Sequence, residues 1–367
     1  MKKRLAILTL AFALVFALTA CAGKTETETT PADKEQVEVT DSQEDKTVTE
    51  ENTENTNTEE ASDEEAEAPS EKPVLNIGTL KGPTGMGMAQ LMENDEAGQS
   101  AIDYNFEIAG APDQIIGKIV KGSVDVAAVP SNLAAVLDVK TKGQVQLLGV
   151  NTLGVLFIVE NGQEIQSIED LSGKTILASG KGASPEYVLN YILKENGLDE
   201  SVAVEYAVEH SEAAAKTISG DSQVSLLPQP FVTSALLSGE STRIALDLTS
   251  EWEKVTDGSL LPMGAIIVNK AFAKENPEVI EAFMEEYKAS VDFVNENPKD
   301  AGLLIEKFGI LPKAALATKA IPNCNITLID AQTAKPSVQK FLEILHGFNP
   351  KAVGGQLPED AFYYEAH

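Results

Sequence analysis

From residue 74 onward, short apolar segments alternate with amphipathic segments of helical period, and this alternation constrains the fold more than any other feature of the chain. The apolar segments have the length of strands and are expected as strands at 74–80, 104–110, 124–130, 144–151, 155–161, 174–179, 202–208, 223–228, 243–249 and 264–270. The segment 155–161 is almost wholly apolar, which is typical of a buried parallel strand. Strand, turn and helix repeated in two blocks predict an α/β fold.

The ends of several helices can be placed from single residues. Ser131 and Ser184 each come directly after a strand or turn and are expected as helix N-caps. Gly122 is expected to end the helix that precedes it. A long helix should begin at Asn276-Pro277, because apolar residues then recur at steps of three and four on one face. These residues are Ile280, Phe283, Tyr287, Val291 and Val294.

A glycine-rich turn, within GTLKGPTGMGMAQLM at 78–92, connects the first strand to the first helix. It is not a nucleotide-binding loop, because neither Lys-Ser nor Lys-Thr follows Gly87 and position 90 is glutamine. Ligands of open α/β sheets bind at the carboxyl ends of strands. We therefore expect Gly82 and Gly85, with Gly87, to let the backbone approach a ligand, their free amide groups pointing at it. The alternative is a tight turn whose methionines fill the core.

The first 72 residues predict an exported and tethered protein. Residues 1–20 carry a basic start and a short apolar stretch, as a secretory leader does. The segment LTAC resembles a bacterial lipobox, which implies lipidation of Cys21 and a membrane anchor. An ordinary leader with a chance cysteine is the alternative. Residues 21–72 hold eighteen Asp and Glu against four Lys and no aromatic residue, which predicts a disordered linker or, alternatively, an acidic interaction tail.

The charge of the remaining residues disfavours several classes of partner. The chain has a formal net charge of −29, and −18 of this falls on residues 73–367. Phosphate contacts need clustered Lys and Arg, so nucleic acid is disfavoured as a partner, and so is strong binding to anionic lipid. Three scattered histidines and two cysteines offer no metal-ligand spacing, and we expect no metal and no cofactor. Cys324 is expected to be packed, and Trp252 to lie in the core, at the surface or on a ligand ring.

The order of segments resembles the type II periplasmic-binding-protein fold. Four stretches carry the resemblance: IIGKIVKGSVDVAAVPSNLAA, SIEDLSGKTILASGKGASPEYVLNYILKENGL, QVSLLPQPFVTSALL and AIIVNKAFAKENPEVIEAFMEEYKASVDFVNENPKDA. They are similar to segments of the solute-binding lipoproteins that serve ABC importers of thiamine-pyrimidine, alkylsulfonate and nitrate. The resemblance covers roughly residues 73–345 and implies two lobes with a ligand cleft between them. It implies lobe I at 73–154 and 262–367, and lobe II at 155–261.

Candidate ligand-binding residues follow from matching turns of that family, one by one. They are Thr84, Gly85 and Met86, Ser131 and Asn132, Gly182 and Ser184, Gln229, and Met263. These turns hold almost no charge, with Lys81 and Lys181 as the only nearby cations, so an arginine clamp for an anion is not favoured. A small, weakly charged organic solute, thiamine-pyrimidine-like or sulfonate-like, is favoured instead.

The resemblance implies a monomeric receptor outside the cytoplasmic membrane, held there by its lipid anchor. Its partners would be the solute and the permease and ATPase subunits of an ABC importer. Closure about two hinges, near Asn151–Gly154 and Pro262–Gly264, would be the working motion. A tethered sensor or adhesin of the same fold is the alternative. An enzyme of this fold is the least favoured, because no nucleophile or base constellation is present.

Overall fold

The computed structural model describes residues 72–366. The leader, Cys21 and the acidic linker up to residue 71 lie outside the described residues. Among the described helices, none combines the length and the apolar character needed to cross a membrane.

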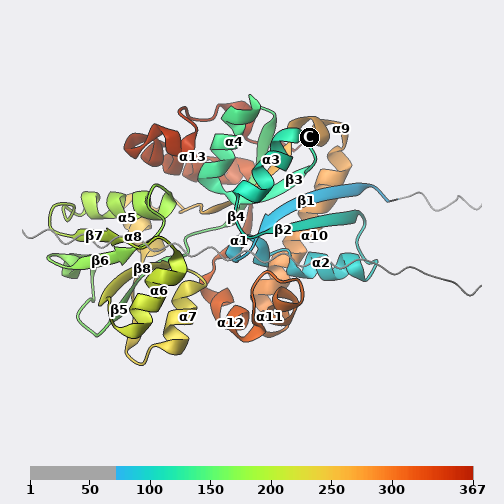
Figure 1. The fold of residues 1–367 in the computed structure, drawn as a ribbon. Helices are drawn as coiled ribbons and strands as arrows, with labels where there is room; N and C mark the ends of the chain where they lie inside the picture. The colour runs from blue at the N-terminus through green and yellow to red at the C-terminus, as the bar shows by residue number, and fades with distance from the viewer. Residues whose placement is uncertain (1–71, 367) are drawn as a thin grey trace, which may run out of the picture. The chain divides into compact units, whose positions relative to one another are not determined.

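The first sheet has six strands in the order β11-β4-β10-β3-β1-β2. Figure 1 labels β1, β2, β3 and β4 of this sheet. Its strands are β1 (Val74–Leu80), β2 (Asp103–Ala109), β3 (Val126–Pro130), β4 (Val145–Thr152), β10 (Gly264–Asn269) and β11 (Ile326–Asp330). The strand β1 is parallel to β2 and β3, whereas β10 is antiparallel to β3 and β4. The carboxyl ends of β1 to β4 therefore share one edge with the amino end of β10.

The second sheet has five strands in the order β7-β6-β8-β5-β9. Its strands are β5 (Leu156–Asn161), β6 (Thr175–Ala178), β7 (Ala203–Tyr206), β8 (Val224–Pro228) and β9 (Thr242–Asp247). The expectation that 155–161 is a parallel strand is wrong, because β5 is antiparallel to both of its neighbours. Its apolar character comes from burial on both faces: Ile158 and Val159 belong to different core clusters.

Helices cover both faces of the first sheet. One face packs against α2 (Ala89–Glu96), α10 (Pro277–Glu296), α11 (Pro298–Lys307) and α12 (Ala314–Ala320). The other packs against α3 (Asp113–Lys121), α4 (Ser131–Thr141) and α13 (Ala331–Phe348). Short segments complete this part: α1 (Pro83–Met86), α9 (Lys270–Glu275), η2 (Ile321–Asn323), η3 (Pro350–Val353) and η4 (Asp360–Phe362). The prediction for α10 is confirmed, because all five residues of its apolar face are buried.

The second sheet lies between α5 (Ser184–Glu195) and α8 (Leu248–Val255) on one face and α6 (His210–Ser219) and α7 (Phe231–Ser238) on the other. The short η1 (Ile168–Leu171) follows β5. Trp252 in α8 is fully buried, with ring centroids 5.4 Å from Tyr191 of α5 and 5.9 Å from Phe341 of α13. Helix α13 thereby joins the cores of the two sheets into one cluster, and Trp252 is a core residue.

The predicted helix caps are partly wrong. Helix α4 begins at Ser131, with Pro130 as its N-cap, and α5 begins at Ser184, with Ala183 as its N-cap. Neither serine side chain caps its helix. Each side chain sits inside the first helical turn, where its hydroxyl is available for tertiary contacts instead. Gly122, with φ 70°, ends α3 as expected.

Candidate functional site

Two crossovers connect the sheets. At these crossovers the carboxyl ends of β1 to β4 meet the carboxyl ends of β6 and β8, and we call this region the crossover edge. The chain passes from β4 to β5 between Thr152 and Leu156, and it returns before β10. The amide of Met263 donates to the carbonyl of Thr152 (2.9 Å), so the two crossovers are bonded to each other. In the second sheet the amide of Gln229, after β8, donates to the carbonyl of Val155 (2.9 Å). Turns that follow β1, β3, β6 and β8 are thus brought to the same region, where ligands of α/β sheets bind.

The turn after β3 brings Ser131 and Asn132 to this region. The Ser131 amide donates to the carbonyl of Met263 (3.1 Å), which places two of the predicted residues side by side. The hydroxyl of Ser131 is buried and has no hydrogen-bond partner. Such a group loses its hydration without compensation, which costs about 1–3 kcal/mol. The half-buried Asn132 donates from Nδ2 to the carbonyl of Ala352 (3.1 Å).

The glycine-rich turn after β1 is explained by packing of the chain on itself. A Cβ on Gly85 would lie 2.2 Å from the carbonyl oxygen of Leu80, so only glycine fits there. The amide of Gly82 donates to Ile310 and that of Gly85 to Gly82, and the expectation of free amides at these two glycines is therefore wrong. Met86 is fully buried in the core.

Thr84, like Pro83 before it, is half-buried, whereas Gly85 and Met86 after it are buried. The Thr84 carbonyl accepts a hydrogen bond from Nδ2 of Asn151 (2.9 Å). The same Nδ2 lies 3.1 Å from the hydroxyl of Tyr287. Asn151 lies directly before the first crossover, and its carboxamide ties the turn after β1 to this crossover.

The turns of the second sheet bring Gly182, Ser184 and Gln229 to the same edge. The hydroxyl of Ser184 donates to Oδ1 of Asn132 across 3.3 Å, which is a direct bond between the two sheets' helices. Gln229 is buried, and its Oε1 accepts from the hydroxyl of Thr233 (2.7 Å), whereas its Nε2 has no partner. Gly182 is exposed, and its amide donates to Glu186.

Sequence reasoning missed a second group at this edge, which consists of Ser179, His210 and Phe231. Ser179 follows β6, and its Oγ lies 2.6 Å from Nδ1 of His210, the first residue of α6. The imidazole is 5.5 Å from the ring of Phe231, the first residue of α7. Burial lowers the pKa of His210, so this side chain presents a neutral imidazole near neutral pH. The sequence could have indicated this group, because each of the three residues either follows a strand of the second sheet or begins one of its helices.

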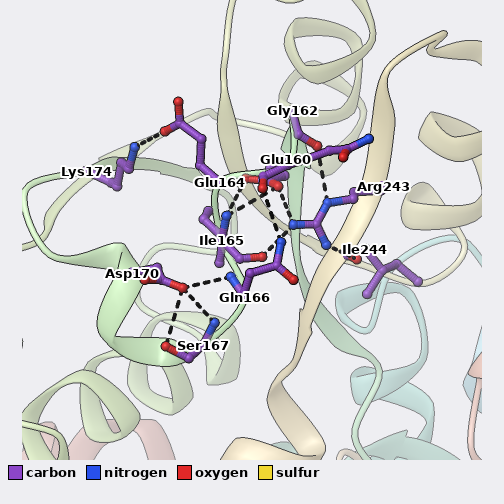
Figure 2. A network of polar contacts seen from close by, with 11 residues as sticks. Glu160, Gly162, Glu164, Ile165, Gln166, Ser167, Asp170, Lys174, Arg243 and Ile244 are labelled. Atoms are coloured by element: carbon purple, nitrogen blue, oxygen red, sulfur yellow. Dashed lines mark hydrogen bonds and ion pairs between the residues drawn. The ribbon is translucent and has the colours of Figure 1, made fainter.

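The only arginine of residues 72–366, Arg243, lies at the opposite edge of the second sheet. Figure 2 shows its guanidinium directed at Glu160, near the end of β5, and at the carbonyl of Gly162 (3.2 Å). Glu160 is buried and also accepts from the amide of Ile165 (3.1 Å). Arg243 is therefore committed to an internal ion pair, and no arginine of the described residues is at the crossover edge.

The described part of the chain has no clustered metal-ligating side chains and no exposed thiol. It contains no group of three or more His, Cys, Asp and Glu placed to hold a metal ion. Cys324 is fully buried, and burial raises the pKa of its thiol to about 12. The prediction that Cys324 is a packed residue is confirmed.

The profile of the family described as NMT1/THI5 like matches residues 118–301, half of the chain. The chain belongs to the NMT1/THI5-like family. Among curated proteins, no sequence matches it significantly.

Solved structures resemble this NMT1/THI5-like chain over most of its length. An ABC transporter from Parabacteroides distasonis is 26% identical with a TM-score of 0.68, covering 80% of this chain and 99% of that one. The periplasmic aliphatic sulphonate binding protein SsuA from Escherichia coli is 17% identical with a TM-score of 0.63, covering 80% and 92%. The periplasmic nitrate-binding protein NrtA from Synechocystis PCC 6803 is 12% identical with a TM-score of 0.53, covering 77% and 83%.

These likenesses confirm the predicted two-lobed type II periplasmic-binding-protein fold. The three structures are named as a transporter and two binding proteins, not as enzymes, in agreement with the expectation for this NMT1/THI5-like chain.

Proposed function

We propose that this protein is an extracytoplasmic receptor that captures a small organic solute between its two sheets and delivers it to an ABC importer. The lobes would be residues 73–154 with 262–367, and residues 155–261. Closure would occur about the two crossovers, and the importer would bind the closed form better, so that delivery depends on the solute. The names of the structural neighbours support this class of function.

One observation carries the proposal of a ligand site at the crossover edge. Ser131 Oγ and Gln229 Nε2 are both buried, both lack a hydrogen-bond partner, and both belong to turns at the carboxyl ends of strands, one in each sheet. Buried polar groups are otherwise satisfied with few exceptions. A hydroxyl that donates or accepts and an amide that donates would together suit a solute with polar groups on two sides.

The chemistry of this edge favours a weakly charged solute. Its polar groups are hydroxyls, carboxamides and the neutral imidazole of His210, and Lys181, one of the two cations predicted nearby, lies over the ring of Tyr206 at 5.4 Å. The single arginine is engaged with Glu160 elsewhere. A thiamine-pyrimidine-like molecule, held by hydrogen bonds and by apolar walls such as Phe231, fits this composition better than a sulfonate-like one, whose full negative charge would rely on hydroxyl and amide donors alone.

The remaining parts of the proposal come from the sequence. A lipid on Cys21 and an acidic linker over residues 22–72 would hold a monomeric receptor at the outer face of the membrane. A tethered sensor or adhesin would use the same pocket without a permease. Adjacent permease and ATPase genes would favour the receptor.

Native mass spectrometry of the protein, purified without denaturation, tests the proposal directly. We expect a bound organic molecule of a few hundred daltons that is lost on unfolding, and this mass would identify the solute class. Titration calorimetry should then show weaker binding by the double variant Thr84→Ala/Ser131→Ala, with folding intact. Ser100→Ala is the matched control, because its hydroxyl is also buried and without a partner but lies before β2, at the other edge of the first sheet. Equal affinity of the double variant and the wild type would overturn the site.

A further inference from the structure

A cavity lies on the first sheet, between α10 and the last described residues of the chain. Its volume is about 920 Å³. Its lining comes from α10, from the sheet and the start of α13, and from the C-terminal segment. The lining residues that carry the argument below are Leu148, Ile280, Met284, Leu328, Tyr364 and the charged residues of the rim. None of the residues proposed to bind the solute lines this cavity, so it is a separate groove.

The floor of the groove is apolar. Leu148 of β4 and Ile280 of α10 are buried beneath it, whereas Met284, Leu328 and Tyr364 are half-buried and line it. Covering an apolar floor of this kind with a partner is favourable, because it removes apolar surface from water. Met284 also adapts its shape to the side chains that it meets.

The rim of the groove is acidic. Its carboxylates are Glu281, Glu285, Asp292, Asp330 and Glu365, and all five are exposed. The single cation of the rim, Lys288, is already bonded to Asp292 of the same helix, with Nζ 2.7 Å from Oδ2 and 3.0 Å from Oδ1. The rim therefore holds an excess of negative charge above an apolar floor, and the complementary surface is apolar with positive charges at its sides.

The length of the groove indicates what kind of molecule has this complementary surface. The residues of α10 that line it run from Pro277 to Asp292. At 1.5 Å per residue these positions extend over about 22 Å, which is more than a compact solute spans but equals about seven residues of extended polypeptide.

From this combination we propose that the groove along α10 binds a short, extended segment of a partner polypeptide in which lysine or arginine residues accompany apolar ones. The apolar side chains lie on Met284, Leu328 and Tyr364, and the cationic ones meet the carboxylates of the rim. This site is independent of the solute class, and it gives the receptor a contact with a partner protein that does not involve the crossover edge.

Fluorescence anisotropy tests the proposal with a labelled peptide of about eight alternating lysine and leucine residues, a length that spans the groove when extended. We expect saturable binding to the full chain that weakens as salt is raised from about 0.05 M to about 0.5 M. A peptide of alternating glutamate and leucine should not bind. Absence of binding by the lysine peptide would overturn the proposal.

Two matched double variants separate the groove from the general acidity of the protein. Glu281→Lys/Glu285→Lys reverses two rim charges, and Glu278→Lys/Glu296→Lys reverses two exposed charges of the same helix that do not line the groove. We expect at least a roughly tenfold loss of peptide affinity for the first variant and less than about twofold for the second. Equal losses in both would mean that the peptide senses only net charge, and the groove would then be rejected. Circular dichroism of each variant checks that α10 is intact.

Discussion

The hydroxyl of Ser184 lies 3.3 Å from Oδ1 of Asn132, so the first turn of α5 in one lobe is hydrogen-bonded to the first turn of α4 in the other. This hydrogen bond joins the side chains of two predicted ligand-binding residues, one from each lobe. If the two sheets close on a solute as proposed, this bond would favour the closed arrangement, because it needs the first turns of α4 and α5 to be close together.

Replacing Ser184 by alanine should therefore weaken solute binding without unfolding the protein. Loss of one hydrogen bond corresponds to roughly a threefold to tenfold decrease in affinity, measured by calorimetry. Ser201→Ala is the control, because that hydroxyl bonds only to the carbonyl of Leu198 within the second lobe. If both variants bind equally well, the bond to Asn132 has no part in closure.

Ser131→Ala is expected to separate stability from binding. The Ser131 hydroxyl is buried without a partner, so its removal should leave the free energy of unfolding unchanged or raise it by up to about 1–3 kcal/mol. Solute affinity should fall in the same variant. Urea denaturation and calorimetry on one preparation check both effects, and a clear loss of stability would show that the hydroxyl is used by the protein itself.

The ion pair of Arg243 and Glu160 should matter for stability and not for binding. Arg243→Met leaves a buried carboxylate without its partner, and we expect a loss of about 3–5 kcal/mol in urea denaturation. Solute affinity of the folded variant should be unchanged, because the pair lies at the opposite edge of the second sheet.

Two further variants check that explanation. Arg243→Met/Glu160→Met removes both charges and should recover part of the lost stability. Lys174→Met breaks the more exposed pair with Glu164 and should change stability little. A larger loss in the double variant than in Arg243→Met would contradict a buried unpaired charge as the cause.

His210 should make stability depend on pH in a defined range. Burial lowers the pKa of its imidazole below the ordinary value of 6.5, so the unfolded chain takes up a proton at a higher pH than the folded protein does. The contribution of His210 to the unfolding free energy is therefore constant above pH 6.5 and becomes unfavourable as the pH falls below it. Urea denaturation between about pH 7.5 and about pH 5.5 should show a smaller decrease for His210→Gln than for wild type. If the stability of wild type and of His210→Gln falls equally over this pH range, burial does not lower the pKa of the imidazole.

Much of the fold could be predicted because local patterns carry it. The period of apolar residues placed α10 and its buried face, and Gly122 ended α3, since helix faces and left-handed turns depend on nearby residues. The direction of β5 could not be predicted. An apolar run shows that both faces are covered, but the neighbours that decide parallel or antiparallel pairing come from residues 224–228 and 242–247.

The candidate site, like the fold, was predictable in part. The sequence alone predicts that polar residues such as Ser131, Ser184 and Gln229 lie in turns after strands, because strand ends are visible as changes in composition. The hydrogen bonds of these residues are set by the tertiary structure: Ser184 bonds to Asn132 and Gln229 bonds to Thr233, whereas the Ser131 hydroxyl has no partner. The tertiary fold also places His210 beside Ser179 and buries Met86 in the core. Hydrogen bonds and burial join residues that are distant in the chain, and no local pattern of the sequence records them.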